Sequence, residues 1–565
     1  MLLSALAEWA EQQMGGENDL GPKMYAETAI KWFILLDHEG TFEGIVSAGG
    51  GGKQDRGKMM AAPQTARLTD ITARLLADNG EYVLGVGRDS GKTDRNVEVR
   101  HRAFVESVRQ CAAEINEPSV KAVLGFLDKG PMPVHMIPEG FEASDVLTFK
   151  VDGMLPIQLP SVQRYWAAVS RTMKGRRLRC LLCDKVKFCP ESHPFRVKGV
   201  RGGNLTGMAI SSANARAFES YGLSRSLNAP TCLDCSELAI KALNKILQHE
   251  DHHVNIGPVS CVFWCKGAEF NPTLLLSDPQ RNEMSALLQT PWDARAVTGT
   301  QARFFAAALT ANKARVVVRD WIDTPLEQAK ANLSRYFVLQ EIVDYDGTEG
   351  SPCSIFGLAA ATVRSARDLP ARTPVSLLHF VFHGGVLPLW LLSEAVRRNR
   401  AEQAVTRSRA ALIKLVLLSE APNCEEGNMV RLDVGEFHPA YLCGRLLADL
   451  DKLQRQAMGR KIMKSSDAER FYGAASVTPS LVFPTLLRRA EAHFAKLRAP
   501  NFAARYTLRG QLEEILCGLK HSFPSLLTTR EQGLFALGYY HQRAHDRAQA
   551  RERKEQKVTK RAAAE

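Results

Sequence analysis

Four cysteines in two close pairs are the residues of this sequence best suited to a defined chemistry. Cys180 and Cys183 form one Cys-x-x-Cys pair, and Cys232 and Cys235 form a second. Two residues between thiols let both sulfurs face one ion, and four soft ligands in a tetrahedron suit zinc. A closed four-cysteine site leaves no position for a reactive water, so the spacing predicts a structural Zn2+ in a zinc-ribbon-like segment.

Other residues leave the ligand set open. Cys189 and His193 lie close enough in the sequence to be alternative ligands, and the competing interpretation is a set of unrelated buried thiols. Cys261 and Cys265 occur in an apolar run and favour a buried strand instead. The chain has 12 cysteines and no export signal is apparent, so we expect a cytoplasmic protein whose cysteines bind metal or are buried.

The segment between the two pairs contains a basic, glycine-rich run from residue 197 to 208. Lysine and arginine there could contact phosphates, and asparagine could recognise the edges of bases. We therefore expect the following residues to bind DNA, with the cysteines holding their loop in place: Lys198, Arg201, Asn204 and Thr206.

An earlier glycine-rich segment, residues 48–57, has four consecutive glycines beside basic side chains. Glycine permits a close approach of backbone to a ligand but imposes little order. A flexible hairpin connection is one interpretation. The other is a second DNA-binding loop whose contacting residues are Lys53, Gln54, Arg56 and Lys58.

Gly91-Lys92-Thr93 invites comparison with a nucleotide-binding phosphate loop, because residues 81–85 before it are strand-like. That motif requires a glycine five positions before the Gly-Lys pair, and Val86 occupies this position. A zinc-containing, nucleotide-dependent enzyme acting on nucleic acid is therefore kept only as the alternative hypothesis. An assay of nucleotide hydrolysis would distinguish it.

No catalytic constellation accompanies these motifs. The histidines at 38, 252, 253 and 545 lack supporting carboxylates or metal-ligand spacing, and no Gly-x-Ser-x-Gly or His-Glu-x-x-His motif occurs. We therefore expect a protein that recognises and does not catalyse. A scaffold whose charge only assists assembly is a third possibility.

The composition limits the class of partner. The 565 residues contain 73 Lys plus Arg against 61 Asp plus Glu, giving a net charge of +12 and a pI near 9.1. Such an excess favours an acidic partner, most commonly nucleic acid. The most apolar runs, at 386–394 and 412–420, are far below the roughly 18 residues of a membrane span.

The periodicity predicts an α+β protein. Residues 30–36 and 41–46 read as two strands joined by a tight turn, and residues 97–124 as helix. The length favours about three or four domains. We expect an N-terminal α+β domain, the zinc-ribbon-like segment, a mixed α/β middle region and an antiparallel helical bundle with a basic tail, at 1–175, 176–242, 243–425 and 429–565.

The predicted bundle is rich in basic residues that could guide a single strand by its phosphates. Three on one predicted helix are the strongest candidates: Arg488, Arg489 and Lys496. The others assigned to its polar faces are Arg445, Arg455, Arg460, Lys461, Lys464, Arg498, Arg505 and Arg509.

Several motifs resemble the large subunit of the subtype I-C CRISPR surveillance complex, Cascade. They are spread in order over most of the chain: Thr65-Ala-Arg67, DNGEYVLG at 78–85, Cys180-Leu-Leu-Cys183, HPFRVKGVRGG at 193–203, SANARAFESYG at 212–222, Asn228-Ala-Pro230, NKARVVVRDW at 312–321 and FALGYYHQ at 535–542. The zinc prediction rests on ligand spacing and not on this resemblance.

The resemblance implies a subunit of an RNA-guided complex that recognises the protospacer-adjacent motif on duplex DNA, promotes the R-loop and holds the displaced strand. Its partners would be target DNA, guide RNA, the backbone, 5′-handle-binding and small subunits, and a recruited helicase-nuclease that cuts. In this family the C-terminal region is also made separately as the small subunit. Met429 is suitably placed for such an internal start.

Overall fold

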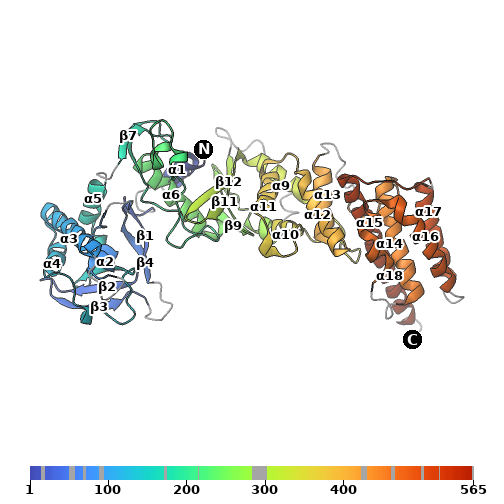
Figure 1. Cartoon of the computed structure of the whole chain (residues 1–565), viewed down its shortest axis with the longest axis horizontal. Helices are drawn as coiled ribbons and strands as arrows, with labels where there is room; N and C mark the ends of the chain where they lie inside the picture. Colours follow the sequence, from blue (N-terminus) through green and yellow to red (C-terminus); the bar gives the residue numbers. More distant parts are fainter. Residues whose placement is uncertain are drawn as a thin grey trace. The chain divides into compact units, whose positions relative to one another are not determined.

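The structure of this chain is a computed structural model. It describes residues 1–13, 20–49, 57–67, 71–87, 95–170, 175–213, 215–280, 282, 302–420, 429–459, 465–497, 502–520 and 522–562. These residues form two compact units, one of residues 1–248 with 311–317, and one of residues 249–310 with 318–565 (Figure 1). The predicted four-part division into domains stays a prediction.

A four-stranded sheet in the order β3-β2-β6-β5 begins the first unit. Strand β2 (Trp32–Leu36) pairs antiparallel with β3 (Phe42–Ser47) and parallel with β6 (Val146–Val151), which pairs antiparallel with β5 (Ala77–Asn79). Helices α3 (Arg95–Ile115) and α4 (Pro118–Leu127) lie beside this sheet (Figure 1). The predicted pair of strands and the turn between them are confirmed, although Ile30 ends the preceding strand.

The helical prediction for residues 97–124 is confirmed with one interruption, and the strand predicted at 81–85 is wrong. Residues 97–124 are two helices, because Asn116 adopts a left-handed conformation at φ 51° and Pro118 starts a new helix. Residues 81–85 are not a strand: Gly80–Val83 form the short helix α2, whose Tyr82 amide donates to the Asn79 side chain. A phosphate loop follows a strand, so its structural context is missing here. Residues 88–94 lie outside the described part of the chain.

Four further strands of the first unit form two antiparallel pairs. Strand β1 (Tyr25–Ile30) pairs antiparallel with β4 (Lys58–Pro63), and β7 (Gly175–Arg179) with β8 (Val186–Pro190). The other helices are α1 (Leu2–Gln13), α5 (Pro160–Val169) and α6 (Leu233–Gln248), of which α1 packs along α6.

The second unit starts with an antiparallel sheet in the order β12-β11-β10-β9. Its strands are β9 (His253–Ile256), β10 (Val259–Lys266), β11 (Arg303–Asn312) and β12 (Arg315–Pro325). Trp264, Phe305 and Trp321 stack against one another on three adjacent strands. Phe263 and Phe304, which alternate with them along β10 and β11, belong to the large apolar core.

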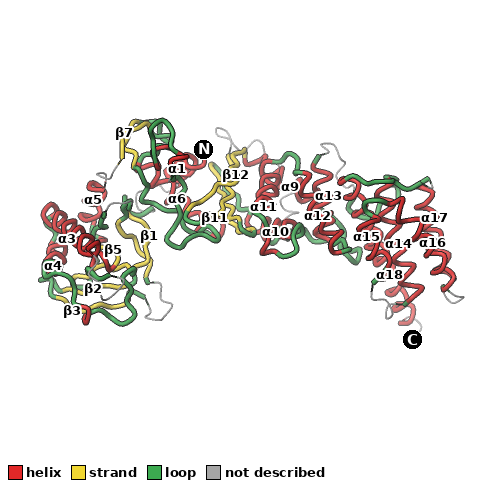
Figure 2. The backbone as a smooth tube through the Cα atoms, in the orientation of Figure 1, coloured by secondary structure: helices red, strands yellow, loops and turns green. Residues whose placement is uncertain are grey.

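Helices make up the rest of the second unit, as the continuous red of Figure 2 shows. They are α7 (Thr273–Ser277), α9 (Leu326–Gln340), α10 (Ile355–Ala360), α11 (Arg372–His383), α12 (Leu389–Glu402), α13 (Arg407–Ser419), α14 (Pro439–Met458), α15 (Asp467–Ala475), α16 (Pro479–Lys496), α17 (Phe502–Gly518) and α18 (Thr529–Ala562). The α+β class with an all-helical C-terminal region is confirmed. A capping box starts α18: the Thr528 amide donates to Glu531 Oε2 at 2.7 Å, and the Glu531 amide donates to Thr528 Oγ1 at 3.4 Å.

Helices α14 and α18 approach each other unusually closely. A Cβ on Gly538 would lie 2.1 Å from the carbonyl oxygen of Tyr441, and one on Gly444 would lie 2.0 Å from that of Phe535. Arg445 is buried beside this contact, with its Nε donating to Gln542 Oε1 at 3.2 Å. Its predicted place on a polar face of the bundle is therefore wrong, because it satisfies a buried amide between two helices.

We expect Gly538→Ala to lower the free energy of unfolding by about 1–3 kcal/mol, because the added methyl overlaps backbone that cannot move alone. Gly510→Ala is the matched control. Its Cβ meets nothing within 4 Å in α17, so helix propensity should make the substitution neutral or stabilising by up to about 1 kcal/mol. Urea titration checks both. Equal effects at the two positions would contradict the packing argument.

Candidate metal centre and nucleic-acid interface

The four predicted cysteines come together in the first unit. The Sγ atoms of Cys180, Cys183, Cys232 and Cys235 all lie within 4.8 Å of one another, and those of Cys183 and Cys232 are 4.0 Å apart. Sulfurs around a tetrahedral zinc with bonds of about 2.3 Å would be about 3.8 Å apart. The cluster therefore has the ligand type, number and spacing of a structural zinc site.

Two local structures supply the cysteine pairs. Cys180 and Cys183 lie in the turn between β7 and β8, whose paired ends are Arg179 and Val186. Cys232 directly precedes α6, and Cys235 lies in its first turn. The Cys232 amide donates to Cys180 Sγ at 3.2 Å, so backbone as well as sulfur joins the two halves.

The protonation of the cluster favours metal binding. A hydrogen bond from the Cys235 thiol lowers the pKa of Cys232 to about 5. Burial raises the pKa of Cys180, and the pKa of Cys235 is raised because it keeps the proton that it shares with Cys232. One thiolate thus forms readily, and a cation would displace the remaining protons.

The cysteine-rich segment has little else to hold it together. Its apolar cluster has four buried members: Cys180, Cys189, Leu227 and Cys232. Segments with so small a core generally need a metal or a disulfide. Cys189 is one of the packed thiols and His193 lies in a different place, so neither alternative ligand belongs to the four-sulfur cluster.

The basic run between the pairs forms a closed loop. Val197 and Met208 exchange backbone hydrogen bonds of 2.9 and 2.8 Å across its base. Its glycines allow the chain to fold tightly: a Cβ on Gly207 would lie 2.5 Å from Arg196 Cβ, and one on Gly203 would lie 2.3 Å from Met208 Cε. The sequence 197–208 therefore forms a defined loop, which we call the 198–207 loop.

Helix α6 holds this loop through one side chain. Asn244 Oδ1 accepts a hydrogen bond from the Lys198 amide at 2.8 Å, and Asn244 Nδ2 donates to the Arg196 carbonyl at 2.9 Å. The same helix carries Cys235 in its first turn. The cysteine cluster and the base of the loop are thus both attached to helix α6.

The four predicted DNA-binding residues of the loop are not equivalent. Arg201, Asn204 and Thr206 are exposed, and Asn204 Oδ1 accepts from the Thr206 amide at 3.2 Å. Lys198 is half-buried and its Nζ donates to the Glu27 carbonyl of β1 at 2.6 Å. Burial lowers its pKa, and nearby Arg74 lowers it further. The exposed members are therefore the ones placed for phosphate or base contacts.

The first glycine-rich loop is only partly described. Lys53, Gln54 and Arg56 lie outside the described residues. Lys58 is exposed at the start of β4 and pairs with Ile30 of β1. The Lys198 contact with β1 therefore joins the base of the 198–207 loop to the strand pair in which the first glycine-rich segment ends.

The predicted bundle residues lie on α16 of the second unit and are exposed. Arg489 pairs with Asp467 at 2.9 Å, and Lys496 Nζ contacts Met458 Sδ at 3.4 Å. Arg488 has no ion-pair partner in the described part of the chain. Of the wider basic set, Arg460, Lys461, Lys464 and Arg498 lie outside the described residues.

One candidate contact residue was missed from the sequence. Tyr221 is 98% exposed, and it adopts a left-handed backbone at φ 52° in the turn that Ser220 and Leu223 close by mutual hydrogen bonds. A non-glycine residue in this conformation is strained, and strain of this kind concentrates at functional sites. The Tyr-Gly dipeptide could have signalled the turn, but only the folded chain shows the exposure of the ring.

In the first unit, a segment with four clustered cysteines thus carries a basic loop. Compared with known protein families, residues 6–546 match the family described as CRISPR-associated protein (Cas_Csd1). The chain therefore belongs to the Csd1 family, the large subunits of the type I-C Cascade complex. No match is found among curated proteins.

Family membership confirms the resemblance seen in the sequence. Csd1 proteins are structural subunits of Cascade, and their membership of that complex implies Cascade and nucleic-acid partners. Within the described residues, each helix is too short or too polar to cross a lipid bilayer.

Asn244→Ala should loosen the loop, because it removes two hydrogen bonds worth about 1 kcal/mol each. We expect faster hydrogen–deuterium exchange at the Lys198 amide, whose acceptor is lost. Asn312→Ala is the control, since Asn312 is exposed in the same unit. Mass spectrometry of peptides covering 196–208 measures the exchange. An unchanged rate in Asn244→Ala would show that the side chain does not hold the loop.

Proposed function

We propose that this chain is the non-catalytic large subunit that recognises the protospacer-adjacent motif on duplex DNA. It would then promote R-loop formation and hold the displaced strand for a recruited helicase-nuclease. The main support is the 198–207 loop: it is basic, closed at its base, and held by Asn244 to helix α6, which carries one of the clustered cysteines and directly follows another.

The chemistry of the exposed loop residues supports this role. Arg201 would contact phosphate, and the Asn204 amide can recognise the edge of a base, most favourably adenine. Gln54 and its basic neighbours would add a second set of contacts from the first glycine-rich segment. Tyr221 offers an exposed ring on which an unpaired base could stack, an interaction worth about 1–3 kcal/mol.

The second unit would act on the displaced strand through phosphate contacts. Arg488 is the best candidate for such a phosphate contact, because it is exposed and has no ion-pair partner among the described residues. Arg489 would have to exchange Asp467 for a phosphate. Separate production of the bundle from Met429 also stays a prediction.

The cysteine cluster would hold Zn2+ as a structural ion. Four thiolates close the tetrahedron, so the metal would supply stability and no catalysis. It would fix the β7–β8 turn to the start of α6 in a segment whose own core is small.

Alanine at Asn204 or Gln54 should weaken binding of the assembled complex to duplexes that carry the motif, by roughly 5- to 150-fold for one bidentate base contact of about 1–3 kcal/mol. Binding to motif-free duplex should change little. Electrophoretic or fluorescence titration measures both affinities.

Arg488→Ala tests the proposed role of the second unit in holding the displaced strand. It should leave initial motif binding intact and shorten the lifetime of the R-loop. If both loop variants bind motif-bearing targets as the wild type does, the assignment of the two loops is wrong.

Cys235→Ser should remove bound zinc and lower the unfolding temperature of the first unit, because a three-sulfur site binds the ion weakly. The purified wild type should contain one zinc per chain. Cys189→Ala is the control and should retain the metal, since its sulfur is outside the cluster. Elemental analysis measures the stoichiometry. A zinc-free wild type, or full zinc in Cys235→Ser, would refute the site.

A further inference from the structure

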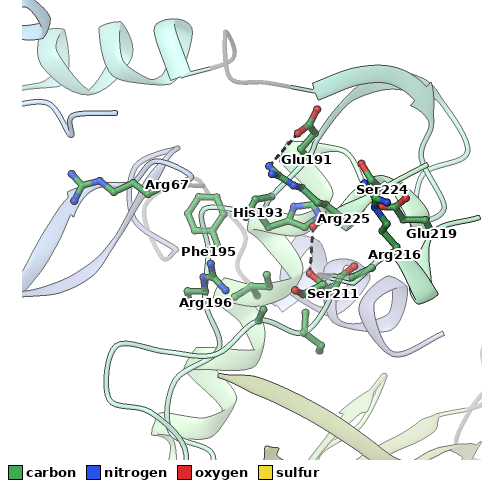
Figure 3. Close-up of a pocket in the computed structure, with 17 residues that line it drawn as sticks. Arg67, Glu191, His193, Phe195, Arg196, Ser211, Arg216, Glu219, Ser224 and Arg225 are labelled. Atoms are coloured by element: carbon green, nitrogen blue, oxygen red, sulfur yellow. Dashed lines mark hydrogen bonds and ion pairs between the residues drawn. The ribbon is translucent and has the colours of Figure 1, made fainter. Parts of the chain in front are cut away.

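A cavity of about 640 Å3 lies within the first unit, beside the 198–207 loop (Figure 3). This is within the range of about 300–1,000 Å3 that is usual for small-ligand sites. Segments 191–196, 209–213 and 216–226 form most of its wall, and Ile240 of α6 adds to it. Its lining is rich in arginine and serine, so it is suited to a polar ligand.

His193 is a buried side chain whose hydrogen bonding is incomplete. It is only 7% exposed, and neither ring nitrogen has a partner among the described residues. An unsatisfied buried polar group costs about 1–3 kcal/mol. Burial, with a smaller contribution from Arg196, lowers its pKa to about 4. The neutral ring therefore has one donor and one acceptor, and neither is satisfied within the described residues.

Arg196 lines the same cavity and is unpaired. Burial lowers its pKa, and within the described chain its guanidinium makes no hydrogen bond or ion pair. Of the other charged lining residues, Arg225 pairs with Glu191 at 3.3 Å and Arg67 bonds to Asp78, whereas Arg216 and Glu219 are exposed. Figure 3 shows Arg196 beside Phe195, apart from the Arg225–Glu191 pair.

These two side chains match complementary parts of one kind of ligand. An unpaired guanidinium at a cavity wall suits a phosphate, which it binds through parallel N–H donors. A neutral imidazole that needs both a donor and an acceptor suits a nucleobase edge, which presents both. Inorganic phosphate alone would satisfy Arg196 and fill little of the volume.

We propose that this cavity binds a single nucleotide, with its phosphate on Arg196 and its base on His193. The serines at 211 and 212 line the same cavity and can bond to sugar or phosphate oxygens. A free nucleotide and one nucleotide of a nucleic acid chain share this chemistry. If the ligand is a nucleotide of a nucleic acid chain, the inference rests on the function proposed above.

Calorimetric titration of the full chain tests the cavity with four probes. They are inorganic phosphate, a mononucleotide 5′-monophosphate, the matching nucleoside, and a short single-stranded oligonucleotide. We expect the mononucleotide or the oligonucleotide to bind, and the nucleoside and phosphate each to bind at least tenfold more weakly.

Arg196→Gln should weaken binding of the nucleotide probe at least tenfold. Arg176→Gln removes the same charge from an exposed position on β7 outside the cavity and should change the affinity less than twofold. Hydrogen–deuterium exchange of wild-type peptides spanning 191–196 gives a readout that needs no variant. Binding should slow it.

The outcomes of these experiments distinguish a free nucleotide from a nucleotide within a nucleic acid chain. They also separate this inference from the proposed function. If the mononucleotide binds, and Arg196→Gln leaves motif-dependent DNA binding by the complex unchanged, the ligand is a free nucleotide. If only the oligonucleotide binds, and Arg196→Gln loses both this binding and motif-dependent DNA binding, the ligand is a nucleotide of the nucleic acid. If no probe binds, or Arg196→Gln matches Arg176→Gln, the inference is overturned, even where motif-dependent DNA binding stands. If the wild-type complex binds motif-bearing and motif-free duplexes equally well, only the proposed function is overturned.

Discussion

The first unit depends on helix α6, because several chain segments are fixed to its side chains. Its first turn contributes Cys235 to the sulfur cluster, and Asn244 bonds to the residues on either side of Val197 at the start of the 198–207 loop. Between them, Glu237 accepts from the Met24 amide at 2.7 Å and Lys241 donates to the Pro22 carbonyl at 2.8 Å. A helix is stiff over this length, so a metal bound at one end would stabilise the position of the loop at the other.

The C-terminal motif of the family has a structural explanation in the second unit. Gly538 lets α18 touch the backbone of α14, and Phe535 and Tyr539 are buried on either side of it. Tyr540 donates its hydroxyl to the Val343 carbonyl at 2.9 Å, and His541 shares a hydrogen bond of 3.0 Å with Tyr441. These residues order the helices, so the motif identifies the fold rather than a contact with DNA.

The basic residues predicted to bind nucleic acid differ in their exposure. Arg445, a basic residue of the predicted bundle surface, is buried, and Lys198 of the loop bonds to a backbone carbonyl. Arg201 and Asn204 are exposed on the same loop. A basic sequence run thus contains both structural and contact residues, and the neighbouring segments decide which is which.

The sequence by itself determined what depends on local chemistry. The spacing of Cys180 and Cys183 predicted a ligand pair, and periodicity predicted a helical C-terminal region. Tertiary structure decided what depends on distant segments. Lys198 turns inward to a carbonyl 171 positions away, and the incomplete hydrogen bonding of His193 becomes visible only where three segments enclose a cavity. Burial is a property of the whole fold, so no local pattern could have predicted either.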